Sequence, residues 1–180
     1  VEFYMFDCFD LLSIDHERAI LDPDTGNLVG AEQFRLNSAV DIIPFMAKIR
    51  RSRTSGSTRM NVAYGGHGGS SRSHASIILT LRRRNSKSNR VSITQLHIVD
   101  LAGAERAHSH GYSEMNVYEA MTAYYQGRYS DITASQGIVV NYELHCLRTA
   151  VVQCASAARA GRIIQPPRQC STPFVKYASG

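Results

Sequence analysis

The chain has 180 residues, of which 43% are hydrophobic and 19% charged, the composition of an ordinary soluble globular domain. This length predicts one domain over residues 1–180 with a substantial core, and no apolar run approaches the length of a membrane span. No signal peptide is recognised at Val1, and the missing initiator Met indicates a fragment. The net charge of +5, with a pI near 9.2, favours an acidic partner surface without identifying it.

The cysteines are scattered and form no Cys-x-x-Cys pair, which argues against a disulfide framework or a zinc site and fits a reducing cytosolic setting. They are Cys8, Cys146, Cys154 and Cys170. His108 and His110 lack further ligands at the usual spacings, so a solvated loop is favoured there over a metal pair.

The first third of the chain predicts a strand, a turn, a helix and a loop. Residues 1–12 are apolar on both faces of a strand, as in a sheet interior. Residues 22–26 predict a turn, and residues 38–51 a helix that Pro44 should kink or start late. The helix should then end at a solvated arginine cluster, and residues 56–69 should form a loop. That cluster comprises Arg50, Arg51 and Arg53.

Two strand patterns follow, over residues 76–83 and 91–99, and their charged connection predicts a hairpin. The second strand ends at Asp100, and Gly103 lies three residues later. Nucleotide hydrolases use such an exit to place a Mg²⁺-directed carboxylate and a phosphate-sensing backbone amide. A plain strand-to-turn exit is the simpler alternative for this short pattern alone.

The last third predicts two helices. One covers residues 114–125, within a long tyrosine-containing segment. The other covers residues 139–160, where small and apolar side chains recur at helical spacing before Gly161 stops the helix. Pro173 should interrupt any helix that follows.

A second motif, Ser70-Ser71-Arg72-Ser73-His74, precedes the first strand of the hairpin. Followed by Asp-Leu-Ala-Gly-x-Glu at residues 100–105, it resembles the kinesin motor domain, the first motif being similar to switch I and the second to switch II. The resemblance implies an α/β fold, namely a partial kinesin-type P-loop NTPase fold with a mixed β-sheet flanked by helices. It also implies a microtubule-based ATPase located in the cytoplasm on the cytoskeleton.

The resemblance assigns roles to individual residues, with ATP and Mg²⁺ as the cofactors of the intact motor. Ser70, Ser71 and Gly103 would contact the nucleotide, and Ser71 and Asp100 would serve the metal. Arg72 and Glu105 would form the ion pair that closes the two switches and positions the attacking water.

The microtubule is the implied partner, through the helix of residues 139–160. Val140-Asn141-Tyr142-Glu143-Leu144 resembles the start of the microtubule-facing helix, where Asn141 matches the family, and Arg168 matches it in the segment 166–170 beyond the helix. Glu143 replaces a family Ser, and Tyr142 and Ser171 each replace a family Lys, which should weaken attraction to acidic tubulin.

Other features depart from the family. No Gly-x-x-x-x-Gly-Lys-[Ser/Thr] phosphate loop occurs in the 180 residues, so the isolated chain is predicted to be inactive and a phosphate-loop half is expected before Val1. Glycines at 65–69 and the long segment 107–136 are insertions. One alternative is therefore a non-motor scaffold that binds microtubules or partners without ATP turnover. A nucleic-acid binder is supported by the pI alone, because the basic residues lack interleaved aromatics.

Overall fold

The computed structural model describes residues 1–15, 17–22, 27–63, 72–104, 117–126, 132–162 and 172–179. The strands are β1 (Glu2–Tyr4), β2 (Asp7–Phe9), β3 (Ile20–Leu21), β4 (Leu28–Val29), β5 (His74–Arg84) and β6 (Val91–Asp100). The helices are a 3₁₀ turn η1 (Ala39–Asp41), α1 (Ile42–Ala63), α2 (Val117–Tyr125), α3 (Ile132–Arg159) and α4 (Pro173–Ser179). Within these ranges, no helix combines the length and apolar character needed to cross a membrane.

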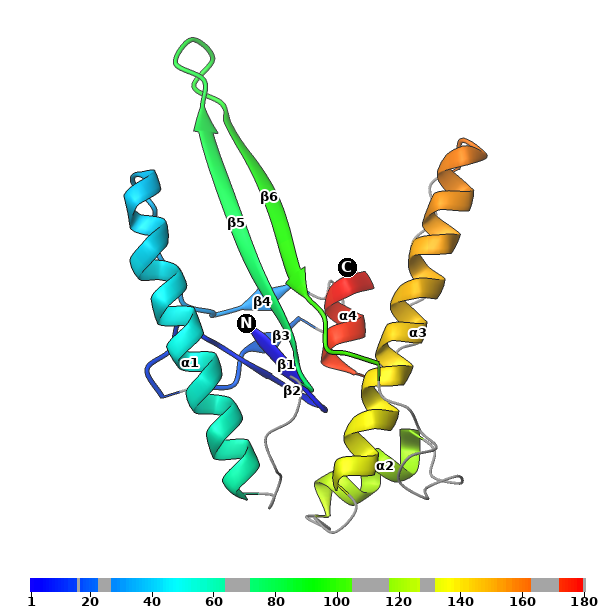
Figure 1. The fold of residues 1–180 in the computed structure, drawn as a ribbon. Helices are drawn as coiled ribbons and strands as arrows, with labels where there is room; N and C mark the ends of the chain where they lie inside the picture. Colours follow the sequence, from blue (N-terminus) through cyan, green and yellow to red (C-terminus); the bar gives the residue numbers. More distant parts are fainter. Residues whose placement is uncertain are drawn as a thin grey trace.

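A four-stranded sheet in the order β2-β1-β5-β6 organises the fold, with α1 on one side and α3 and α4 on the other (Figure 1). Strands β3 and β4 form a separate two-stranded sheet. This combination of strands and flanking helices agrees with the expected α/β class. All pairings between the described strands are antiparallel, so the parallel neighbours of a mixed sheet do not occur among them.

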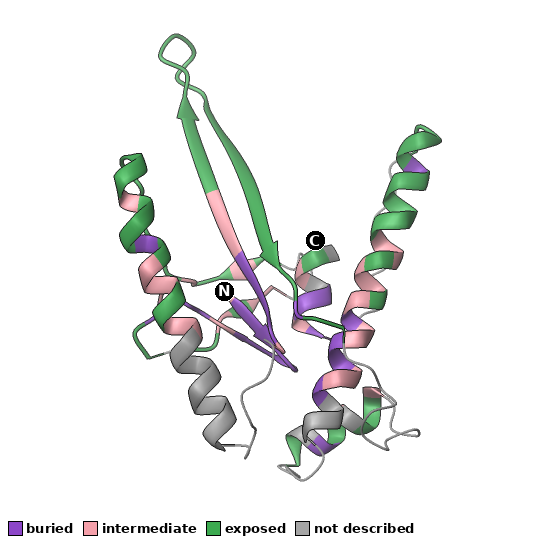
Figure 2. Ribbon diagram, in the orientation of Figure 1, coloured by how far each residue is buried: buried purple, intermediate pink, exposed green. Residues whose placement is uncertain are grey.

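The segment predicted as one long strand at the N-terminus is instead a tight hairpin of β1 and β2. Tyr4 pairs with Asp7, and Met5 in the turn has a φ of 54°, a left-handed conformation that reverses the chain. The apolar residues on both faces are nevertheless buried, as the pattern required, because the hairpin lies between the helices (Figure 2).

Helix α1 is longer than predicted and contains most of the expected loop of residues 56–69. The start follows the sequence: the Asp41 carboxylate accepts the Ser38 backbone N–H at 2.9 Å, and Pro44 lies in the first turn, where no helical N–H bond is lost. The helix continues to Ala63, so Arg53 lies in its interior, and the predicted helix end at the arginine cluster is wrong.

Helix α3 is the longest helix and ends as predicted, with Gly161 at a φ of 64° just beyond it. It begins at Ile132, two turns before the predicted start. The interruption predicted at Pro173 is wrong. Pro173 is the first residue of α4, a position that tolerates the missing N–H, and the Val175 N–H donates to Thr172 Oγ1 at 3.4 Å as a cap.

The core consists of two clusters around the β1–β2 hairpin. One joins Tyr4, Met5 and Phe6 to Val139 of α3. The other joins Phe3 and Cys8 of the hairpin to α4 through Phe174 and Val175. These contacts fix α3 and α4 against the end of the sheet where β5 begins and β6 ends.

The rest of β5 and β6 projects from this core as a long hairpin (Figure 1). All ten residues of β6 are exposed, including apolar side chains that a sheet interior would bury. Residues 151–159 at the end of α3 are also exposed apart from Ala157, although their spacing predicted an apolar stripe there. Leu96, Ile98, Val151 and Val152 are each at least half exposed.

Candidate nucleotide-switch site

The antiparallel pairing of β5 and β6 brings the two sequence motifs together. Ala75 at the start of β5 lies opposite Asp100 at the end of β6. The segment entering β5, which contains Arg72, and the segment leaving β6, which contains Gly103, therefore meet at one end of the sheet. The predicted hairpin is confirmed, and the predicted neighbourhood of the two motifs follows from its register.

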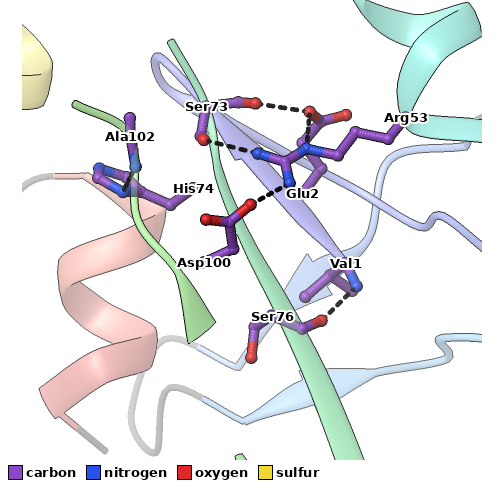
Figure 3. A network of polar contacts seen from close by, with 8 residues as sticks. All are labelled: Val1, Glu2, Arg53, Ser73, His74, Ser76, Asp100 and Ala102. Atoms are coloured by element: carbon purple, nitrogen blue, oxygen red, sulfur yellow. Dashed lines mark hydrogen bonds and ion pairs between the residues drawn. The ribbon is translucent and has the colours of Figure 1, made fainter. Parts of the chain in front are cut away.

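At this end of the sheet, Arg53 of α1 reaches two carboxylates (Figure 3). Its Nη1 donates to Asp100 Oδ2, and its Nε lies 3.7 Å from Glu2 Oε1. Its Nη2 donates to the Ser73 carbonyl at 3.4 Å, and the Ser73 hydroxyl donates to Glu2 Oε1 at 2.6 Å. The planar guanidinium thus joins α1, β1 and the ends of both hairpin strands.

Asp100, the predicted metal-directed carboxylate, is the exposed member of this group. Its side chain is 68% exposed, whereas that of Glu2 is 2% exposed. Glu2 is therefore a buried structural charge held by Arg53 and Ser73, and Asp100 is an accessible carboxylate whose described ionic partner is Arg53.

His74 is a second junction, completely buried at the start of β5. The Ala102 backbone N–H donates to His74 Nδ1 at 3.0 Å, and His74 Nε2 lies 3.2 Å from Glu143 Oε2 on α3. The imidazole also stacks on Phe174 of α4, with ring centroids 4.1 Å apart. One side chain thus contacts the exit of β6 and two helices.

Burial raises the pKa of the Glu143 carboxyl, and the nearby polar groups of His74 and Thr172 partly oppose this effect. Glu143 is 2% exposed and faces His74. The charge of Glu143 therefore does not lie on the surface of α3, and the weak attraction to tubulin stays a prediction that rests on Tyr142 and Ser171. Asn141, the family-matching residue on the same helix, is half-buried.

Arg72 enters the site from the segment before β5. Its Nη1 donates to Gln136 Oε1 on α3 at 2.7 Å, and the Gln136 amide donates to the Tyr4 hydroxyl. The predicted partner Glu105 lies outside the described residues, so the Arg72–Glu105 ion pair stays a prediction. The same holds for Ser70, Ser71 and Arg168.

The described residues fit part of a nucleotide and Mg²⁺ site. Gly103 is exposed, and the space where a side chain would project from it is open, so a phosphate could approach its amide. Asp100, three residues earlier, offers an oxygen of the kind that Mg²⁺ and its bound water prefer. Among the described residues no group of three or more His, Cys, Asp or Glu is placed to hold a metal by protein ligands alone.

Sequence reasoning did not find Arg53, Gln136 or the His74–Glu143 contact. His74 was visible as the last residue of the switch-like motif, but its partner lies 69 positions away on another element. The available signal for Glu143 was a carboxylate at a position of α3 that helical spacing turns toward the core.

Comparison with known proteins identifies the family of the chain. The family model described as "Kinesin motor domain" matches residues 1–123, more than half of the chain. The chain belongs to the kinesin motor domain family. The matched range ends within α2, so it does not include α3 or α4.

Individual kinesins match over part of the chain. Kinesin-like protein KIN-8B of Arabidopsis thaliana is 36% identical over 110 residues, which are 59% of this chain and 13% of that protein. Chromosome-associated kinesin KIF4A of Homo sapiens is 36% identical over 112 residues, 59% of this chain and 9% of that protein. Kinesin-like protein KIN-4C of Oryza sativa is 28% identical over 151 residues, 67% of this chain and 11% of that protein. The chain thus spans a small part of the length of these relatives.

Proposed function

We propose that the chain is the switch-carrying part of a microtubule-based motor ATPase. The observation that carries this proposal is the pairing of Ala75 with Asp100, because it sets both switch-like motifs at one end of the sheet. Ser70, Ser71 and Gly103 would contact the nucleotide, and Ser71 and Asp100 would hold the Mg²⁺ shell. When bound, Mg²⁺ neutralises charge on the phosphates, while Gly103 supplies an amide donor beside them.

Arg72 and Glu105 are proposed to close the two switches. Arg72 already bonds to Gln136 on α3, so its transfer to Glu105 would exchange a neutral partner for a charged one. Helix α3 is the proposed microtubule-facing helix, with Asn141 as its contact, and Arg168, which follows it in sequence, is the second proposed microtubule contact. Cytoplasmic, cytoskeletal localisation follows from that role.

The proposed motor needs phosphate-binding donors beyond this chain, since the 180 residues contain no phosphate-loop sequence. A segment that supplies this loop would add a strand along β6, whose ten residues are all exposed. The chain alone should therefore not turn over ATP.

Steady-state phosphate release from the isolated chain tests this statement. No turnover is expected, and turnover that Asp100→Asn abolishes would contradict it. Adding a phosphate-loop half of a related kinesin should restore nucleotide binding to the wild-type chain and less to Asp100→Asn. Binding that is equal in both would contradict the role of Asp100.

A second candidate is a non-motor scaffold that binds microtubules without ATP turnover. The ion pair of Arg53 with Asp100 favours the scaffold, because a water molecule bound to Mg²⁺ would have to displace Arg53 from the carboxylate. Microtubule co-sedimentation of the chain combined with a phosphate-loop half of a related kinesin, with and without MgATP, separates the two candidates. A motor should change its affinity with nucleotide, and a scaffold should not.

A further inference from the structure

The His74 side chain has contacts that reach beyond its motif. It is buried, it accepts a hydrogen bond from the Ala102 N–H, and it lies 3.2 Å from Glu143 on α3. Ala102 is itself 4% exposed and immediately precedes Gly103, whose amide is exposed. A single imidazole therefore connects the backbone beside the proposed phosphate position to the longest helix.

The hydrogen bond from Ala102 fixes the tautomer of His74. An N–H donor at Nδ1 requires a lone pair on that nitrogen, so the proton of a neutral ring must lie on Nε2. Nε2 faces the Glu143 carboxylate. A displacement of the Ala102 backbone would therefore move the rigid His74 ring, and with it the Nε2–H group that faces Glu143 on α3.

The contact between His74 and Glu143 is close but not aligned. Nε2 and Oε2 are 3.2 Å apart, within ion-pair distance, yet Nε2 has no partner in hydrogen-bond geometry among the described residues. Glu143 Oε1 is likewise buried without such a partner in the described structure, although Thr172 is near enough to favour the charged carboxylate. Unmet buried polar atoms are costly, so a small shift of α3 that aligns the N–H with the carboxylate would be favourable.

We propose that His74 and Glu143 are positioning residues that couple the Ala102–Gly103 backbone to α3. This inference rests on the proposed function, since it takes the Gly103 amide as the one that faces phosphate. The ring of His74 cannot bend, and its stacking on Phe174 limits its rotation. A displacement of Ala102 therefore changes the alignment of Nε2 with Glu143, and movement of α3 changes the hydrogen bond to Ala102 in return.

The test is amide hydrogen exchange of the full 180-residue chain, followed by NMR. Glu143 does not bond to Ala102 directly, so coupling predicts an effect at a distance. Glu143→Ala should speed exchange of the Ala102 amide by roughly three- to tenfold beyond the change shared by other slow amides of β5, as for the loss of one hydrogen bond. Glu143→Gln keeps an acceptor for Nε2–H and should restore slow exchange.

Val139→Ala is the matched control. Val139 is also completely buried on α3, but it packs in the cluster of Tyr4, Met5 and Phe6. The Val139→Ala substitution should speed amide exchange across the core, with no larger effect at Ala102 than at the other core amides. If Glu143→Ala does not fold, Glu143→Leu removes the acceptor at similar volume and takes its place.

Either of two results would overturn the proposal. One is a change in the exchange rate at Ala102 that equals the change at the other core amides in both Glu143→Ala and Val139→Ala. The other, measured on the unmodified chain, is imidazole nitrogen shifts that place the His74 proton on Nδ1. Neither measurement involves nucleotide, so the chain could fail to bind ATP and the coupling would still be tested.

Discussion

Arg53 and Asp100 are 47 residues apart and form an ion pair between the middle of α1 and the last residue of β6. The same guanidinium lies 3.7 Å from the buried carboxylate of Glu2. Arg53 therefore holds the accessible, proposed metal-directed carboxylate and a structural carboxylate at once. The Arg53 side chain consequently affects both the local structure of the candidate site and its proposed chemistry.

Replacing Arg53 should destabilise the fold mainly through Glu2. Arg53→Ala removes the cation that lies beside the buried Glu2 carboxylate, and this loss should cost about 2–3 kcal/mol. Arg53→Lys keeps the positive charge but loses the planar guanidinium, so its free energy of unfolding should lie between those of the unmodified chain and Arg53→Ala. Urea unfolding measures this free energy.

Lys48→Ala is the control for Arg53→Ala on the same helix. Lys48 lies 3.7 Å from Glu32, and both side chains are over a third exposed, so its loss should cost ~0.2–1 kcal/mol. Equal losses in the two variants would show that Glu2 does not depend on Arg53.

The exposed strand β6 should make the chain self-associate. Leu96 and Ile98 are exposed apolar side chains, residues 91–99 contain no Asp, Glu, Lys or Arg, and an unpaired edge offers free backbone donors and acceptors. Leu96→Lys, at a position 58% exposed, should lower the sedimentation-measured association severalfold with little loss of stability. Ser88→Lys adds the same charge at the exposed hairpin tip and should leave association unchanged. A similar decrease in both would point to net charge instead of the edge.

Cys8 should be much less reactive than Cys154. Burial raises the pKa of the Cys8 thiol to about 12, so very little thiolate forms at pH 8, whereas Cys154 is exposed. In a Cys170→Ser background, mass spectrometry after iodoacetamide treatment should find label at Cys154 first. Cys8 should react only as the chain unfolds, and equal labelling in the folded chain would contradict its burial.

The hairpin of β5 and β6 could be predicted from sequence because its signals are local: β-branched strands on either side of a polar tip. The β1–β2 hairpin could not, since Met5 and Phe6 carry no turn signal and the reversal is enforced by packing against Val139. Pro173 was misjudged because the same residue breaks a helix interior and starts a helix.

The candidate site was predictable where a motif carried it and not where partners came from distant elements. The position of Asp100 at the end of β6 follows from the strand pattern, and the site roles of Asp100 and Gly103 stay predictions that need both motifs. Arg53 was assigned to a solvated helix end because nothing near it in sequence marks the continuation of α1 to Ala63. Glu143 was assigned to the surface by analogy with the family, although its neighbours on α3 turn it toward His74.

Glu143 should make stability depend on pH in a direction opposite to that of a surface carboxylate. Burial raises its pKa in the folded chain above the ordinary value of a Glu carboxyl. The folded state then binds more protons than the unfolded state between the ordinary and the raised pKa. Stability is therefore full below the ordinary pKa and is lost as the pH rises through the raised one, by about 1.4 kcal/mol for each unit of pKa difference.

Glu143→Gln tests this sign because glutamine fills nearly the same volume and cannot ionise. The variant should be more stable than the unmodified chain at pH 8, and the difference should shrink as the pH falls toward 4. Glu119→Gln, at an exposed position of α2, controls for the removal of one charge and should show no such trend. Urea unfolding at several pH values gives the comparison. If Glu143→Gln instead loses stability most at pH 8, the carboxylate is held by His74 and Thr172 more strongly than burial penalises it.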